Sequence, residues 1–196
     1  MASTGGDGGV SPLGLSAIPL TEEEENLFRV FRSVVEGEKL ETTVRVAGGW
    51  VRDKLLGQEG PKDIDIALDD MSGEEFAGKM NDWYKKNNQR FMKVGIIRSN
   101  PEKSKHLETA TVNIGSFDVD FVNLRTEEYA DDSRIPLIEM GTPYEDAMRR
   151  DLTINALFYN VNKGCVEDFT HRGLRDLNAQ VVDTPLEPLV TLKDDP

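Results

Sequence analysis

The 196-residue sequence has little of several residue types, and each shortage excludes a class of protein. Its single cysteine, Cys165, rules out a disulfide within the chain, and two histidines, His106 and His171, leave no ligand spacing for a zinc site. No apolar run approaches the roughly 18 residues that a membrane-spanning helix needs. We therefore expect an intracellular globular protein with no membrane partner; the sequence leaves cytoplasm, nucleus and mitochondrion open.

Basic residues are also scarce. The chain has 23 Lys and Arg against 36 Asp and Glu, a net charge of −13. A protein that holds nucleic acid through its overall charge needs a basic surface, so this class is excluded and an RNA partner must be held locally. The length suits one domain, since domains typically have about 100–200 residues.

The first twenty residues contain neither a basic residue nor a continuous apolar core, so they resemble neither a signal peptide nor a transit peptide. We interpret residues 1–20 as a flexible tail and residues 21–170 as the folded domain. Residues 171–196 contain Pro185 and Pro188 and then a turn-like ending, and we interpret them as the start of a linker.

Hydrophobic periodicity predicts a mixed α/β (α+β) fold. Helices are expected at residues 21–37 and 72–86 and from Thr142 onward; strands are expected at residues 44–46, 63–68 and 117–124 and near Ile96 and Val112. Thr142 and Glu145 form a capping-box pattern, and Gly37 suits a left-handed helix cap.

The strand at residues 63–68 carries an acidic pair. Asp63 and Asp65 lie on one face, because strand side chains alternate, and paired carboxylates are typical Mg²⁺ ligands. A neighbouring strand offers a third carboxylate, for which we choose Asp120 over Asp118 because it lies nearer the strand centre. Taken alone, the acidic pair is equally compatible with a solvated strand face.

Gly48 and Gly49 lie between a strand and a helix, where bare backbone N–H groups favour an anion. Arg52, one turn into the helix, adds a charge for a triphosphate. By itself the glycine pair is more typical of a tight connection. However, only a short helix and a loop separate Gly49 from Asp63, which places a phosphate cradle beside the metal pair. This arrangement indicates phosphoryl or nucleotidyl transfer.

A third polar cluster contains Arg149, Arg150, Asp151 and Asn155. Guanidinium groups bind phosphates, whereas a carboxylate and an amide bind ribose hydroxyls; a charge network on a helix face is the alternative. The polar segment from Asn100 to Lys105 is expected to be a loop. Its Lys103 and Lys105, with His106, are either near phosphates or on a plain surface loop.

Four segments together resemble one family. They are GGWVRDKLLG (48–57), DIDIAL (63–68), VDFVNLR (119–125) and RRDLTINALFYN (149–160). In this order they closely resemble the eukaryotic class II CCA-adding tRNA nucleotidyltransferases of the polymerase-beta-like superfamily. The similarity runs from about Thr21 to Pro196.

The resemblance implies a head domain with a mixed, mainly antiparallel sheet flanked by helices. It implies Mg²⁺-dependent addition of CMP and AMP, from CTP and ATP, to the tRNA 3′ end. The family's catalytic carboxylates match Asp63, Asp65 and Asp120, of which Asp63 and Asp65 are the metal ligands. Its nucleotide-binding positions match Gly48, Gly49, Arg52, Arg150, Asp151 and Asn155.

Enzymes of this family continue beyond a DDP sequence into a helical neck that selects the base, whereas this chain stops at Pro196. We therefore expect a catalytic head without its neck. Two alternatives stay open: a nucleotide-binding fragment without turnover, and a poly(A) polymerase of the same superfamily. An Asp-x-Asp phosphatase is disfavoured because no hydroxyl residue follows the acidic pair in DIDIALDD. Base selectivity and oligomeric state are not readable from the sequence.

Overall fold

The computed structural model describes residues 18–87, 94–97, 109–128 and 137–194. Its helices are α1 (Glu22–Gly37), α2 (Gly49–Leu55), α3 (Gly73–Lys86), α4 (Pro143–Met148), the 3₁₀ turn η2 (Thr153–Asn155), α5 (Gly173–Ala179) and α6 (Pro188–Asp194). Its strands are β1 (Val44–Ala47), β2 (Asp63–Leu68), β3 (Val94–Ile97), β4 (Thr109–Ile114), β5 (Phe117–Asn123), β6 (Arg125–Glu128), β7 (Leu137–Met140), β8 (Phe158–Asn160) and β9 (Cys165–Glu167).

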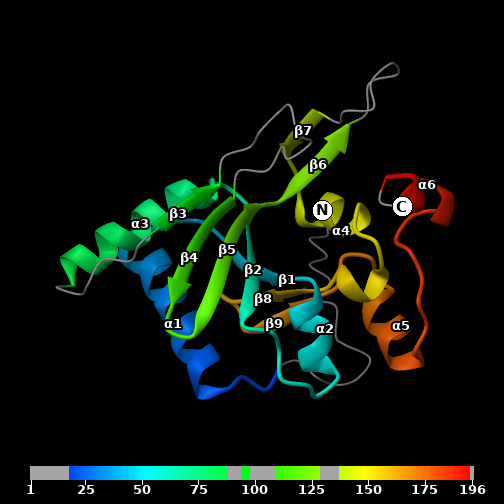
Figure 1. The fold of residues 1–196 in the computed structure, drawn as a ribbon, viewed down its shortest axis with the longest axis horizontal. Coiled ribbons are helices and arrows are strands. Elements are labelled where there is room, and N and C mark those ends of the chain that lie inside the picture. The colour runs from blue at the N-terminus through cyan, green and yellow to red at the C-terminus, as the bar shows by residue number, and fades with distance from the viewer. Residues whose placement is uncertain (1–17, 88–93, 98–108, 129–136, 195–196) are drawn as a thin grey trace, which may run out of the picture.

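A seven-stranded sheet in the order β3-β4-β5-β2-β1-β8-β9 forms the centre of the molecule (Figure 1). Within it, β2 and β5 pair in parallel and the remaining neighbours pair antiparallel. Strands β6 and β7 form a separate two-stranded ribbon. The predicted α+β fold, with a mainly antiparallel sheet flanked by helices, is confirmed.

Helices α1 and α3 lie together against one face of this sheet, while α5 and α6 lie at the other end of the molecule (Figure 1). The face that meets α1 and α3 is apolar: Ile66 and Phe121 are fully buried there. The ring centroid of Phe31 in α1 lies 6.3 Å from that of Phe76 in α3 and 5.7 Å from that of Phe121. These aromatic contacts join both helices to β5, and each ring pair adds about 0.5–1.5 kcal/mol beyond simple burial.

Three helices begin with a capping box, in which a hydroxyl and a glutamate satisfy backbone N–H groups reciprocally. In α1, the Glu24 amide donates to the Thr21 hydroxyl at 3.2 Å, and the Thr21 amide donates to the Glu24 carboxylate at 2.7 Å. The same exchange begins α3 and α4. The helix start predicted at Thr142 is thus confirmed.

The prediction for Gly37 was wrong. Gly37 lies within α1, and the residue with left-handed backbone after the helix is Lys39, at φ 55°. The reason for the glycine is packing: a Cβ at Gly37 would lie 2.7 Å from the indole ring of Trp83 in α3. Gly37 therefore allows the close approach of two helices.

The core extends beyond the predicted domain bounds at residues 21 and 170. Ile18 is 4% exposed, and Leu174 and Leu177 of α5, beyond residue 170, are 5% and 7% exposed. Helix α6 also forms where a turn-like ending was expected. Residues 1–17 of the predicted tail, and the predicted loop from Asn100 to Lys105 with His106, lie outside the described residues. No described helix is both long and apolar enough to cross a membrane.

Candidate active site

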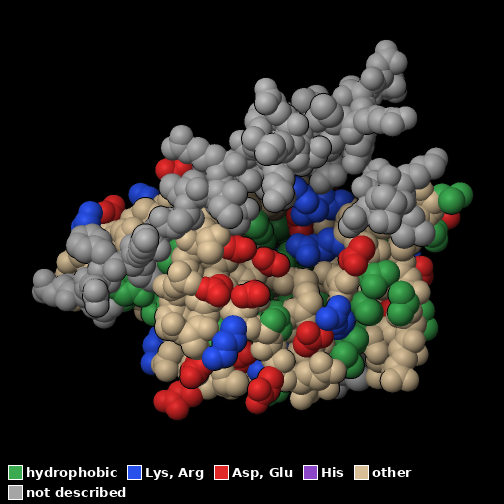
Figure 2. Space-filling model, in the orientation of Figure 1, with side chains coloured by type: hydrophobic (Ala, Val, Ile, Leu, Met, Phe, Trp, Pro, Cys, Tyr) green, Lys and Arg blue, Asp and Glu red, His purple; other side chains and the backbone are tan. Residues whose placement is uncertain are grey.

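A row of carboxylates occupies the sheet face opposite α1 and α3. The parallel register of β2 and β5 places Asp63 beside Asp118 and Asp65 beside Asp120. Their apolar neighbours on both strands point into the core, so the four carboxylates must point the other way. Figure 2 shows acidic side chains gathered over these strands, with Lys and Arg side chains beside them. We call Asp63, Asp65, Asp118 and Asp120 the acidic row.

Strand β4 distinguishes the two carboxylates of β5. The Asn113 amide donates a hydrogen bond to the exposed Asp118, and the Thr111 hydroxyl donates to Asp120 Oδ1 at 2.5 Å. Asp120 is half-buried and lies directly opposite Asp65. Its position favours Asp120 as the third carboxylate, the choice made from the sequence.

The carboxylates repel one another. Burial raises the pKa of Asp65 above its ordinary value, the charges of Asp120 and Asp63 raise it further, and Arg150 lowers it. A bound cation relieves such crowding, so these side chains fit a divalent metal. Within the described ranges, no three His, Cys, Asp or Glu side chains form a ready-made metal cluster. A cation here therefore needs further oxygen ligands from water or substrate, as Mg²⁺ commonly does.

Gly48 and Gly49 lie at the end of β1, beneath two guanidinium groups. Gly48 has φ 76°, a backbone conformation that L side chains rarely adopt. A Cβ there would lie 3.4 Å from Arg150 Nη1, and a Cβ at Gly49 would lie 3.4 Å from Arg52 Nη2. The seven-residue helix α2 adds only a small dipole, so an anion at this turn would be attracted chiefly by the arginines.

Arg52 connects α2 to the segment after α4. Its Nη1 donates to Asn155 Oδ1 at 2.6 Å, and its Nε donates to Asp53 Oδ1 at 2.8 Å. The Asn155 amide in turn donates to both carboxylate oxygens of Asp151, at 3.0 and 3.2 Å. Arg52, Asn155 and Asp151 thus form one continuous polar chain.

Arg150 lies on the other side of the glycine turn. Its Nε and Nη2 donate to Asp146 Oδ2 at 3.1 and 2.8 Å, and its guanidinium carbon lies 5.1 Å from the ring centroid of Phe158. Sequence reasoning missed Asp146. The signal was present, because Asp146 precedes Arg149 by three residues and Arg150 by four, which is ion-pair spacing on a helix.

Asp146 is a buried charge, with its side chain 1% exposed. Burial alone would raise the pKa of this carboxyl, but the adjacent Arg150 and Arg149 hold it below its ordinary value. Arg149 donates to Asp146 Oδ1 through Nε at 3.0 Å. One ionised carboxylate therefore anchors two arginines.

The segment that carries Asp151 and Asn155 is supported from behind, which the sequence did not reveal. The buried Thr153 hydroxyl donates to Asp176 Oδ2 at 2.8 Å, and the Thr153 amide donates to the Asp183 carbonyl at 2.9 Å. A Cβ on Gly173 would lie 2.5 Å from the Thr153 carbonyl oxygen. Residues beyond 170 therefore hold this segment in place.

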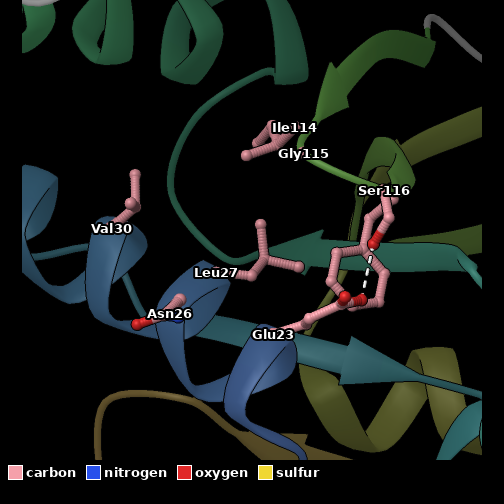
Figure 3. A pocket seen from close by; sticks show the side chains of 8 residues that line it. Glu23, Asn26, Leu27, Val30, Ile114, Gly115 and Ser116 are labelled. Atoms are coloured by element: carbon pink, nitrogen blue, oxygen red, sulfur yellow. Dashed lines mark hydrogen bonds between the residues drawn. The ribbon is translucent and has the colours of Figure 1, made fainter.

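The described part of the chain also has a pocket of about 310 Å³ that lies away from these groups (Figure 3). Leu27 and Val30 of α1 face Ile114 of β4, and the Ser116 hydroxyl donates to Glu23 Oε2 at 2.7 Å. This pocket is on the α1 side of the sheet, whereas the acidic row is on the opposite face. This pocket and the predicted site residues therefore lie in different places.

All nine predicted site residues lie among the described residues, in two adjacent groups. The carboxylates of Asp63, Asp65 and Asp120 form one group, and the glycine turn with its arginines forms the other. The groups adjoin because β1, which leads into the glycine turn, pairs with β2 beside Asp65, with Val46 opposite Ile66. The geometry therefore combines a cation-attracting face with an anion-attracting edge, which is the pair of properties that a metal–triphosphate complex requires.

Residues 44–183 match the family model described as the Poly A polymerase head domain. The chain belongs to this family. The head domain is 50% identical over 193 residues to the mitochondrial CCA tRNA nucleotidyltransferase of Candida glabrata, a match that covers 91% of this chain and 35% of that protein. The resemblance to eukaryotic CCA-adding enzymes is thus confirmed. Nucleotidyltransferases of this family generally use a divalent metal.

Two solved structures share the fold. A CCA-adding enzyme in an apo form is 28% identical with a TM-score of 0.71, covering 90% of this chain and 38% of that one. A CCA-adding enzyme in complex with CTP is 29% identical with a TM-score of 0.63, covering 90% and 37%. The head domain therefore spans little more than a third of the proteins to which it is similar.

Proposed function

We propose that this head domain is the catalytic part of a CCA-adding tRNA nucleotidyltransferase. It transfers CMP and AMP, from CTP and ATP, to the 3′ end of tRNA with the help of Mg²⁺. The observation that carries the proposal is the junction between the acidic row and the two arginines over Gly48 and Gly49. The relative named as a CCA tRNA nucleotidyltransferase and the solved complex with CTP support this choice of substrates.

Asp63 and Asp65 hold the metal, and Asp120 faces them from β5. Bound Mg²⁺ neutralises triphosphate charge and increases the acidity of the RNA 3′ hydroxyl. The carboxylates are already in register before any ligand arrives, because the β2–β5 pairing fixes their spacing.

The remaining site residues position the nucleotide. Gly48 and Gly49 lack side chains, so the triphosphate approaches the backbone closely, and Arg52 and Arg150 bind its oxygens. Asp151 accepts hydrogen bonds from the ribose hydroxyls, and the Asn155 amide donates hydrogen bonds to them. When the 3′ hydroxyl attacks the α-phosphate, the bond to pyrophosphate breaks, and both arginines stabilise the negative charge of the leaving group.

Two other functions are compatible with this geometry. A nucleotide-binding protein without turnover needs the same arginines, and a poly(A) polymerase uses the same head with a different base preference. The head domain works inside the cell, where tRNA and nucleotides are available. Because the chain has a net charge of −13, this head domain holds only the 3′ end of the tRNA, and the rest of the tRNA affinity comes from contacts outside the head domain.

The test is incorporation of labelled CTP or ATP into tRNA lacking its CCA end, in the presence of Mg²⁺. The parent chain is compared with Asp63→Ala/Asp65→Ala and with Asp70→Ala/Asp82→Ala, which removes two exposed carboxylates outside the site. Incorporation by the parent and the control, but not by the site variant, supports the proposal. Incorporation that survives in the site variant, or nucleotide binding without turnover in the parent, overturns it. ATP addition beyond a single residue would favour the poly(A) polymerase.

A further inference from the structure

We propose that Asp146 is a positioning residue that grips one edge of the Arg150 guanidinium and thereby aims its other edge at the triphosphate beside Gly48. This inference rests on the proposed function. Asp146 contacts neither the acidic row nor the glycine turn through any described hydrogen bond. It acts through Arg150.

The geometry of the guanidinium carries the first step. An arginine offers five N–H donors in a rigid fork, so its two edges can serve different partners at once. Asp146 occupies the Nε–Nη2 edge, with both bonds ending on Oδ2. Nη1 lies next to Gly48 and donates to no acceptor among the residues that the structure describes. That nitrogen is left for a ligand.

The second step is rigidity. Oδ1 of Asp146 accepts from Arg149 Nε at 3.0 Å and from the Arg125 backbone amide at 3.4 Å. The Arg150 guanidinium carbon lies over the ring of Phe158. The carboxylate is thus tied to α4 and to the start of β6, and the guanidinium is held along one edge by Asp146 and contacts the Phe158 ring. A phosphate ligand meets a group that has little orientational freedom left to lose.

The third step is competition. Arg150 Nη1 lies beside Gly48, and the pairing of Val46 with Ile66 brings this glycine turn next to Asp65 on β2, so the acidic row is an alternative partner for the guanidinium. An Arg150 released from Asp146 would pair with the acidic row. This new pairing would occupy a carboxylate that the metal needs and would move the arginine away from the triphosphate. Asp146 therefore keeps opposite charges of the same site apart. Asp146 carries one negative charge and pairs with two positively charged arginines, Arg149 and Arg150, so the three side chains together remain cationic.

The experiment measures binding of ATP and of AMP, each with Mg²⁺, to the parent chain and to Asp146→Asn. The substitution preserves shape but replaces an acceptor with an amide. We expect affinity for ATP to fall about tenfold, the size of one charge-assisted hydrogen bond, while affinity for AMP changes less than about twofold. Glu24→Gln is the matched control, since Glu24 is 4% exposed, pairs with Lys54 at 2.8 Å and touches no site residue.

A double-mutant cycle separates positioning from support of the fold. In an Arg150→Met background, Asp146→Asn should cause no further loss of ATP affinity, because the residue through which it acts is gone. Equal losses for ATP and AMP, or a full second loss in the Arg150→Met background, would mean that Asp146 only supports the fold and would overturn the inference.

Arg150→Lys keeps Asp146 in place and covers the case in which Asp146→Asn does not fold. A lysine ammonium is a point charge that cannot bridge Asp146 and the triphosphate as a fork does, so ATP affinity should fall as far as in Arg150→Met. ATP affinity equal to that of the parent would overturn the inference. A parent chain that binds no ATP overturns the proposed function itself, whereas a parent that binds ATP with unchanged variants overturns only the inference about Asp146.

Discussion

The two faces of the central sheet are formed by the same strands, but around β2 and β5 they differ in burial and in charge. On the face toward α1 and α3, residues such as Ile66 and Phe121 are fully buried in a continuous apolar cluster. On the opposite face, the residues between them are carboxylates. Because strand side chains alternate, a shift of one position between Asp63 and Ile66, or between Phe117 and Phe121, moves a residue from the acidic face to the buried face or back.

This difference separates stability from chemistry. The apolar face supplies burial and aromatic contacts, which favour folding. The acidic row opposes folding, since burial and the charges of Asp120 and Asp63 raise the pKa of Asp65 at a cost in free energy. The helix-covered face thus offsets a destabilising arrangement that Arg150 counteracts and that a bound cation would relieve further. Adjacent residues on one strand offer a direct way to test this division.

Asp120→Ala should have the largest effect, and on activity alone. The variant loses the carboxylate opposite Asp65, so nucleotide incorporation should fall at least about a hundredfold. Its thermal midpoint should stay the same or rise, because one repulsive charge is removed. Incorporation assays beside thermal denaturation test both points. A variant that loses both its fold and its activity would show that the acidic row also supports the fold.

Phe121→Ala, one residue further along β5, should show the reverse. Removing a fully buried ring that contacts Phe31 and Phe76 should cost about 3–5 kcal/mol in the free energy of unfolding. Chemical denaturation measures the loss. Activity per folded molecule, measured well below the new midpoint, should remain close to that of the parent. A selective loss of activity in a stable variant would contradict the separation of the faces.

Asp146→Asn should lower the free energy of unfolding by about 1–3 kcal/mol at neutral pH, and the size of this loss should depend on pH. The pKa of Asp146 is lowered in the folded protein, so its ion pairs stabilise the fold above the ordinary value of 3.8 and are lost as pH falls through the folded pKa. The difference in unfolding free energy between parent and variant should therefore be full near pH 6 and shrink below pH 4. A difference independent of pH would contradict the ion-pair interpretation.

Asp118→Asn should have the smallest effect. Asp118 is exposed and already accepts a hydrogen bond from Asn113, and it lies beside Asp63 at the outer end of the row. Incorporation should change less than about threefold. Kinetics measured beside Asp120→Ala decide between the two carboxylates of β5, and a loss as large as that of Asp120→Ala would make Asp118 a catalytic carboxylate as well.

Local patterns predicted the elements well. The alternation in DIDIAL placed β2 at its observed bounds, and the capping pattern placed the start of α4. Such features depend on neighbours within a few residues. Asp120 was chosen over Asp118 because it lies nearer the centre of its strand. Its place opposite Asp65 depends on the β2–β5 pairing, which periodicity alone does not contain.

What the sequence did not reveal depends on contacts between distant segments. Gly37 resembled a helix cap, yet the indole of Trp83 explains it. Asp146 resembled an ordinary acidic residue in a first turn, because its burial depends on β6 and on Arg150. The support that Asp176 gives to Thr153 likewise joins two segments whose spacing carries no local signal.

The parallel pairing of β2 and β5 has a consequence for folding. Antiparallel neighbours such as β4 and β5, or β8 and β9, are joined by short turns, but β2 meets β5 only across the whole connection from Leu68 to Phe117, which includes α3, β3 and β4. Contacts between such distant segments form late, because chain entropy must be lost before they are gained. Asp65 and Asp120 therefore come together only once the sheet is nearly complete, so a nascent or partly unfolded chain cannot present the paired carboxylates to a metal–nucleotide complex.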